Sequence, residues 1–93
     1  MKLILYSKPG CHLCEGLQEK LEQVRNPQIS LEIRDITTRD DWFAAYQYEI
    51  PVLCQEISDR NDGSTSQEVR LPRPSRGISV ERLAAMLHKY GQQ

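Results

Sequence analysis

Cys11 and Cys14 are the residues of this sequence whose type and spacing best suit chemistry. They follow the segment Ser7–Gly10 and open a stretch with helical periodicity. Two cysteines three positions apart in the first turn of a helix lie close enough for a disulfide. The unpaired N–H groups at a helix start stabilise a thiolate, and Lys8 adds a positive charge close by. We therefore expect Cys11 to attack disulfides as a thiolate and the more buried Cys14 to resolve the resulting mixed disulfide.

The same spacing is also half of a zinc site, which leaves a second interpretation open. The residues that would complete a metal site are Cys54, His12 and His88. In this alternative the chain is a carrier that holds zinc or an iron–sulfur cluster through the pair or its counterparts in a second copy. A further alternative is that Cys11 and Cys14 are two inert cysteines. A strand–loop–helix setting favours the redox motif, so we expect no metal ligand here.

The spacing of apolar residues around the pair alternates between that of a strand and that of a helix. Residues Lys2–Tyr6 form a short apolar run that predicts a buried strand. A helix follows and ends before Asn26–Pro27, with apolar positions at helical spacing: Leu13, Leu17, Leu21 and Val24. Apolar residues then alternate with polar ones, which predicts a strand with one buried face: Ile29, Leu31 and Ile33. This βαβ unit predicts two parallel neighbouring strands.

The second half predicts a short helix, a hairpin and a last helix. Thr37 or Thr38 would cap the short helix, which ends ahead of Ile50–Pro51. Two strands around the polar loop Ser58–Ser66 predict an antiparallel hairpin. The last helix starts near Ser79, with one apolar face: Val80, Leu83, Leu87 and Tyr90. The order β-α-β-α-β-β-α predicts an α/β fold in which three helices flank a mixed four-stranded sheet.

Length and charge exclude several classes of protein. The 93 residues fit a single domain, 1–93, and the net charge of −1 comes from interleaved acidic and basic residues. We therefore expect no nucleic-acid or membrane partner, and a monomer. No apolar run approaches the roughly 20 residues that span a bilayer, and the N-terminus is too short and polar for a signal peptide. A cytoplasmic protein is expected, in which three cysteines do not form a disulfide scaffold.

Two stretches resemble the glutaredoxin branch of the thioredoxin superfamily. They are Tyr6-Ser7-Lys8-Pro9-Gly10-Cys11-His12-Leu13-Cys14 and Ile50-Pro51-Val52-Leu53, and the likeness is to short glutaredoxin-like proteins with a Cys-x-Leu-Cys centre. The resemblance implies a thioredoxin-like fold and a thiol–disulfide oxidoreductase that serves electron transport and cell redox homeostasis. Its partners would be disulfide-containing proteins or glutathione, with no tightly bound cofactor and with glutathione as a possible substrate.

The resemblance also implies substrate-binding residues. Ile50–Pro51 would be a cis peptide bond beside Cys11, with the Ile50 backbone open to an extended substrate. Glutaredoxins carry Gly-Gly and a polar cap before the last helix, where the glutamyl end of glutathione binds. Here the stretch Arg76–Ser79 keeps one glycine, Gly77, while Ser79 would cap the helix and present N–H groups to a carboxylate. This departure leaves a third interpretation open, a non-catalytic adaptor that kept the fold.

Other residues have simpler explanations. His12, counted with the residues around the substrate, would tune the Cys11 thiolate, although a side chain pointing to solvent is favoured. Cys54 is expected to pack inertly in a strand. His88 is expected to place a favourable positive charge near a helix C-terminus. The aromatic residues that follow the first βαβ unit are expected to pack in the core and at its edge, and not to form a partner surface: Trp42, Phe43, Tyr46 and Tyr48.

Overall fold

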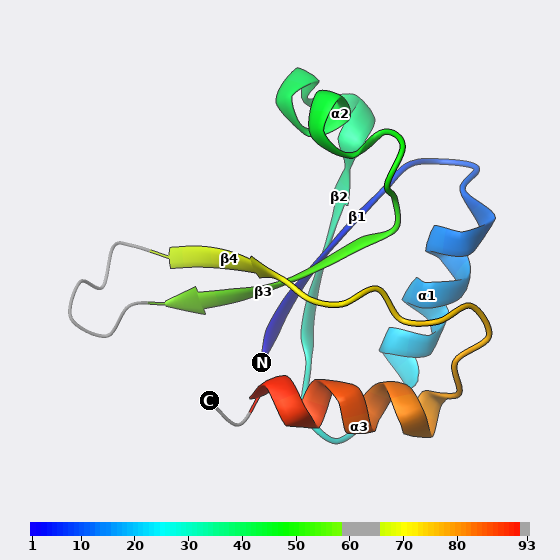
Figure 1. The fold of residues 1–93 in the computed structure, drawn as a ribbon, viewed down its shortest axis with the longest axis vertical. Coiled ribbons are helices and arrows are strands. Elements are labelled where there is room, and N and C mark those ends of the chain that lie inside the picture. Colours follow the sequence, from blue (N-terminus) through cyan, green and yellow to red (C-terminus); the bar gives the residue numbers. More distant parts are fainter. Residues whose placement is uncertain (59–65, 92–93) are drawn as a thin grey trace.

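A computed structural model describes residues 1–58 and 66–91, which form one mixed sheet with helices on both faces (Figure 1). The order of elements is the expected one, with a short 3-10 helix, η1, added after the second strand. The elements are β1 (Lys2–Ser7), α1 (His12–Gln23), β2 (Ser30–Asp35), η1 (Ile36–Thr38), α2 (Asp40–Tyr46), β3 (Val52–Ser58), β4 (Ser66–Arg70) and α3 (Val80–Gly91). The predicted hairpin tip between Ser58 and Ser66 lies outside the described residues.

The sheet has the strand order β2-β1-β3-β4. β1 runs parallel to β2 with Leu5 opposite Ile33, as the βαβ pattern predicted. β1 is antiparallel to β3, and β3 and β4 form the expected antiparallel hairpin. The central position of β1 brings its carboxyl end, and the loop that follows it, to the start of α1.

Alternate residues of β1 point into two separate apolar clusters. Leu3 and Leu5 pack with residues of α1, β3 and α3, while Ile4 and Tyr6 pack beneath α2. Each of these four side chains is at most 2% exposed, because a central strand is covered on both faces. The sheet therefore holds the start of α1 against a packed core.

Charged side chains border the apolar cluster on the face of the sheet below α2. Arg34 donates a hydrogen bond of 2.8 Å to the Tyr6 hydroxyl, which in turn donates to Glu68. Arg34 also pairs with Glu32 and, at 3.2 Å, with Glu68. α2 has only 7 residues and covers only part of this face. These pairs supply hydrogen-bond partners for the polar groups on the rest of it. Burial raises the pKa of Tyr6 well above its ordinary value.

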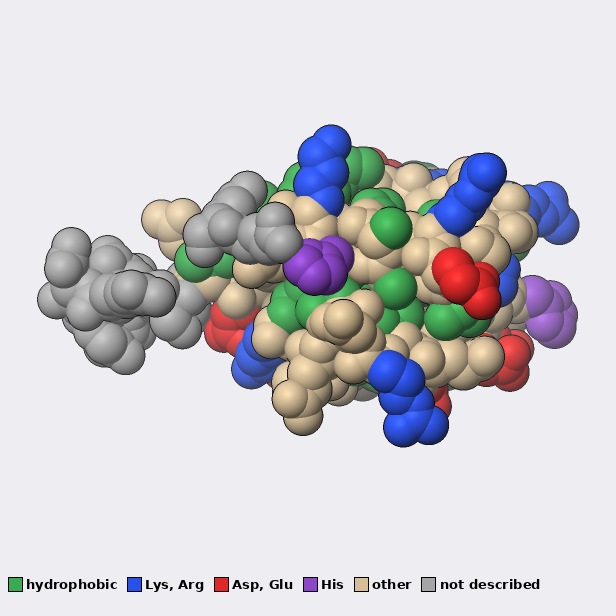
Figure 2. Space-filling view, turned by 90° about the horizontal axis from the view of Figure 1, so that it is seen from below, with side chains coloured by type: hydrophobic (Ala, Val, Ile, Leu, Met, Phe, Trp, Pro, Cys, Tyr) green, Lys and Arg blue, Asp and Glu red, His purple; other side chains and the backbone are tan. Residues whose placement is uncertain are grey.

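The side of the molecule that α3 covers is mixed in character. Seen from this side in Figure 2, a row of hydrophobic side chains is bordered by polar atoms and by projecting lysine and arginine side chains. α3 itself buries Leu83 and Leu87, and the Ser79 hydroxyl accepts a 3.1 Å hydrogen bond from the Arg82 N–H. The predicted helix and its cap are thus confirmed. Among the described residues, no helix is long and apolar enough to span a bilayer.

Three local predictions were wrong. Leu13 is 44% exposed, because the buried stripe of α1 runs through Cys14, Leu17 and Leu21 and leaves Leu13 beside a surface groove. Ile33 is 39% exposed because β2 is an edge strand. Neither Thr37 nor Thr38 caps α2: both lie in η1, which the Asp35 carboxylate caps by accepting from the Thr37 N–H at 2.9 Å. Aspartate is as good an N-cap residue as threonine, and Asp35 precedes both threonines in the chain.

Candidate active site

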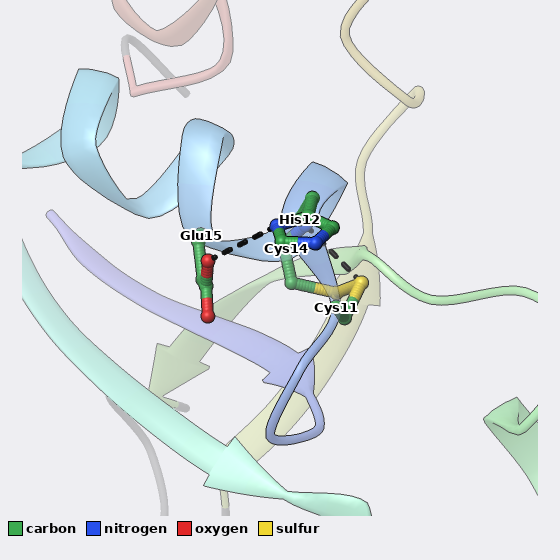
Figure 3. The surroundings of a disulfide bond; sticks show 4 residues. All are labelled: Cys11, His12, Cys14 and Glu15. Carbon is green, nitrogen blue, oxygen red and sulfur yellow. Dashed lines mark hydrogen bonds and ion pairs between the residues drawn. A yellow bond between two sulfur atoms is a disulfide. The ribbon is translucent and has the colours of Figure 1, made fainter.

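Cys11 and Cys14 form a disulfide at the N-terminus of α1 (Figure 3), with Cα atoms 5.3 Å apart. Cys11 is the N-cap residue, and its Sγ accepts a hydrogen bond from the Cys14 N–H at 3.2 Å. A sulfur atom thus occupies the position that a serine or aspartate oxygen usually takes at a helix start. Cys14 is 2% exposed while Cys11 is only partly buried. The expected division into an accessible and a buried cysteine is confirmed.

The loop before the pair is a tight turn. Gly10 has φ +82°, in the left-handed region that favours glycine, and the Cys11 N–H donates to the Lys8 carbonyl at 3.3 Å. The chain can therefore leave β1 and enter α1 within four residues. This turn fixes where Cys11 stands relative to the sheet.

Pro51 follows a cis peptide bond with Ile50, as the resemblance implied, and is buried. A second cis bond, Asn26–Pro27, was not expected. The Ile50 N–H donates to the Tyr46 carbonyl at 3.1 Å, so this donor is already used within the protein. Pairing of the Ile50 backbone with a substrate stays a prediction for the carbonyl alone, because the amide closes the turn that follows α2.

His12 lies between the two cysteines but turns away from them. Its side chain is 96% exposed, and Nδ1 lies 3.7 Å from the Glu15 carboxylate, an ion pair when the imidazole is protonated (Figure 3). A position pointing to solvent is therefore confirmed for the disulfide form.

Lys8 contacts Cys11 through the backbone and lines a cavity together with Cys14. This cavity, of about 260 Å³, lies between α1 and β2, and Glu15 and Asp35 also help to line it. Hydrogen bonds from the Thr37 hydroxyl and N–H lower the pKa of Asp35. The polar lining gives the buried sulfur an ionic neighbourhood on the side away from Pro51.

A larger groove, of about 400 Å³, runs from Pro51 between α1 and the residues 73–78. Gly77 lies in its wall with φ +80°, next to a turn in which the Ile78 N–H donates to the Ser75 carbonyl. Ser79, predicted to bind substrate, does not line the groove and serves as the α3 cap. The groove also contains Lys20 and Arg73, which the sequence interpretation did not single out. Lys20 was detectable, because it shares the helix face of His12 and Gly16.

Cys54 is remote from the pair. It is 3% exposed in the cluster beneath α2, and burial is the main cause that raises its thiol pKa. The expectation that Cys54 packs inertly fits this position. In residues 1–58 and 66–91, no three His, Cys, Asp or Glu side chains gather as metal ligands would.

The aromatic residues divide into two groups. Trp42 and Tyr46 pack on Tyr6, with ring centroids 5.8 and 4.4 Å away, as predicted. Phe43 is 40% exposed and Tyr48 is 91% exposed, which contradicts the packing prediction for both. Tyr48 follows the end of α2 in a turn, where the helical spacing no longer applies.

The sequence matches the family model described as Glutaredoxin-like domain (DUF836) over residues 2–88. Among solved structures, target protein XcR50 from X. campestris is similar at 28% identity, with a TM-score of 0.56 over 94% of this chain and 96% of that chain. Thioredoxin 1 from Thermosipho africanus TCF52B, at 18% identity, shares the fold with a TM-score of 0.59 over 99% and 96% of the two chains. No curated protein matches the sequence.

These matches agree with the geometry of the site. A mixed four-stranded sheet with three helices and a Cys-x-x-Cys pair at the start of α1 is a thioredoxin-like fold, which supports a thiol redox function in general. The family model covers residues 2–88, nearly all of this sequence. The protein belongs to the glutaredoxin-like domain family, and its fold is thioredoxin-like.

Proposed function

We propose that the protein is a thiol–disulfide oxidoreductase in which Cys11 is the nucleophile and Cys14 the resolving thiol. The observation that carries this proposal is the position of Cys11 Sγ, which accepts the Cys14 N–H at the N-terminus of a 12-residue helix. In the reduced protein the same N–H and the helix dipole would stabilise a thiolate on Cys11. The thiolate is the species that attacks disulfides.

The reaction balances between two protein thiols and one substrate disulfide. The Cys11 thiolate attacks a substrate sulfur, forms a mixed disulfide and releases the first substrate thiol. Cys14 loses its proton and attacks the Cys11 sulfur, which releases the second thiol and leaves the Cys11–Cys14 disulfide seen in the structure. Two electrons and two protons thus pass from the protein to the substrate.

The substrates we propose are mixed disulfides of proteins or of glutathione. Pro51 and the residues between the cysteines line the groove that would receive the group attached to the attacked sulfur. Pairing of an extended substrate with Ile50 would use the carbonyl, since the N–H is bound to Tyr46. Glutathione or a thioredoxin-type protein would return the electrons, and no tightly bound cofactor is needed.

Turnover with a small neutral disulfide tests the proposal. Purified protein is given 2-hydroxyethyl disulfide together with one of two reducing systems, glutathione with glutathione reductase or thioredoxin with thioredoxin reductase. Oxidation of the NADPH that the reductase uses is followed. We expect turnover with at least one reductant, its loss in Cys11→Ser, and its retention in Cys54→Ala, which removes the cysteine remote from the site. No turnover of the wild type with either reductant would contradict the proposal and favour an adaptor.

A further inference from the structure

The groove beside the disulfide is cationic, although the protein as a whole carries a net charge of −1. Lys20 comes from α1, and Arg73 and Arg76 come from the segment that connects β4 to α3. Among the described residues that line the groove, none is aspartate or glutamate. The excess of positive charge is therefore a local property of this surface.

These three cations differ from those on the opposite face of the sheet. Lys2, Arg34 and Arg70 each pair with a glutamate there. In the part of the chain that the structure describes, Lys20, Arg73 and Arg76 make no ion pair with a carboxylate. Their charges are available to a ligand without first breaking an internal pair.

The groove adjoins the segment between the two cysteines. His12 and Leu13, which stand between the cysteines, form one end of its lining together with Pro51. Leu13, Leu17 and Ile78 give the groove apolar surface. A chain attached to the sulfur that Cys11 attacks would thus pass over an apolar floor between positive side chains.

We propose that this groove selects disulfides whose cysteine is flanked by acidic residues of a protein. The inference rests on the proposed function and adds its substrate class. Opposite charges speed encounter and fix the register of a bound chain. Glutathione fits less well, because it carries an ammonium group besides its two carboxylates, and the lining residues in 1–58 and 66–91 offer that ammonium no carboxylate.

The segment that carries the arginines is held in shape before a ligand arrives. Arg73 stands between Pro72 and Pro74, and proline restricts the residue before it to extended conformations. The Ile78 N–H closes a turn on the Ser75 carbonyl at 3.0 Å, with Gly77 at positive φ. Binding therefore costs little ordering of the backbone.

Single-turnover kinetics test the preference directly. Three peptides of equal length, with glutamate, glutamine or lysine on both sides of one cysteine, are prepared as mixed disulfides with 2-mercaptoethanol. The mixed disulfide of glutathione and 2-hydroxyethyl disulfide complete the series. Rate constants for reaction with the reduced protein are measured at low and high NaCl concentration.

We expect the glutamate peptide to react about tenfold faster than the lysine peptide at low salt, and high salt to remove most of the difference. In K20Q/R73Q/R76Q the ratio of these two rates falls to about one, since each of the three charges contributes about two- to fivefold. The matched control R25Q/R82Q/K89Q removes three exposed positive charges that do not line the groove and keeps the wild-type ratio.

Equal rates for the glutamate and lysine peptides in the wild type would overturn the preference, as would a ratio that persists in the groove variant. Faster reaction of the glutathione disulfide than of the glutamate peptide, lost in the groove variant, would instead assign the groove to glutathione. In all these cases reaction of the wild type with 2-hydroxyethyl disulfide keeps the proposed function. Failure of that reaction would overturn the function and the preference together.

Discussion

The backbone N–H of Cys14 donates to the Sγ of Cys11 across 3.2 Å, so the two cysteines are joined by a hydrogen bond as well as by their disulfide. The helix that buries Cys14 therefore also supplies the donor that would hold a Cys11 thiolate after reduction. Cys54 has no such donor from a helix start and lies in an apolar cluster. One chain thus contains cysteines in opposite electrostatic settings, and several predictions depend on this difference.

The reactivity of the three cysteines should separate with pH. In the reduced protein we expect Cys11 to be alkylated first, because the helix N-terminus stabilises its thiolate. Cys54 should resist alkylation in the folded state because it is 3% exposed and burial raises its pKa. Iodoacetamide labelling followed by peptide mapping measures both. Labelling of Cys54 before Cys11 would contradict the assignment.

Replacement of the resolving thiol should trap an intermediate. In Cys14→Ser, a mixed disulfide formed on Cys11 has no partner to displace it and should accumulate as one adduct per chain. Cys11→Ser leaves only the buried Cys14 in the site and should form none. Intact mass after exposure to oxidised glutathione provides the measurement. Adducts of equal yield in the two variants would show that Cys11 is not the attacking residue.

Stability should fall on the alkaline side. The folded-state pKa values of Cys54 and Tyr6 lie above their ordinary values of 9.0 and 10.0, mainly because both groups are buried. The stabilisation is complete below pH ~9 and is lost as the pH rises, since the unfolded chain ionises first, by at most about 1.4 kcal/mol per pH unit for each group. Urea unfolding from pH 7 to 11 tests this, with Cys54→Ala showing a shallower decline. A free energy of unfolding that increases above pH 9 would contradict it.

The two arginines that lie over the Trp42 ring should contribute unequally to stability. Arg34, whose side chain is 20% exposed, bonds to Tyr6, Glu32 and Glu68, so Arg34→Met should cost about 1–3 kcal/mol. Arg39 is 57% exposed and pairs with Asp41, so the matched change Arg39→Met should cost less than about 1 kcal/mol. Both guanidinium groups lie over the Trp42 ring, at 5.3 and 4.7 Å, so the two substitutions remove a similar contact and differ mainly in the ion pairs. Equal losses in urea unfolding would refute the ranking.

Much of the fold was predictable because its signals are local. The change of period at Cys11 marks the strand-to-helix junction, and the alternation around Leu31 marks a strand that pairs with β1. The pair, its location and the burial of Cys14 follow from the same pattern. The Ser79 cap was also visible, since a serine before an apolar helix face is a local feature.

Other features depend on contacts between distant segments. Leu13 fits the helical pattern of the core, yet it is exposed, because residues 73–78 form the facing wall of a groove and not a cover. The charge of that groove joins Lys20 to Arg73 and Arg76, more than 50 positions apart in the chain. The use of the Ile50 N–H by Tyr46 likewise depends on how α2 ends. No single-segment pattern contains this information.

Equilibration in glutathione buffers of graded redox potential tests the central claim most directly. Purified protein is brought to equilibrium, quenched with an alkylating agent, and analysed by intact mass and peptide mapping. We predict one reversible transition between a dithiol and a Cys11–Cys14 disulfide, or a glutathione adduct on Cys11, with Cys54 remaining a thiol throughout. If neither species forms at any potential, Cys11 and Cys14 are not a redox centre, and the proposed function is wrong.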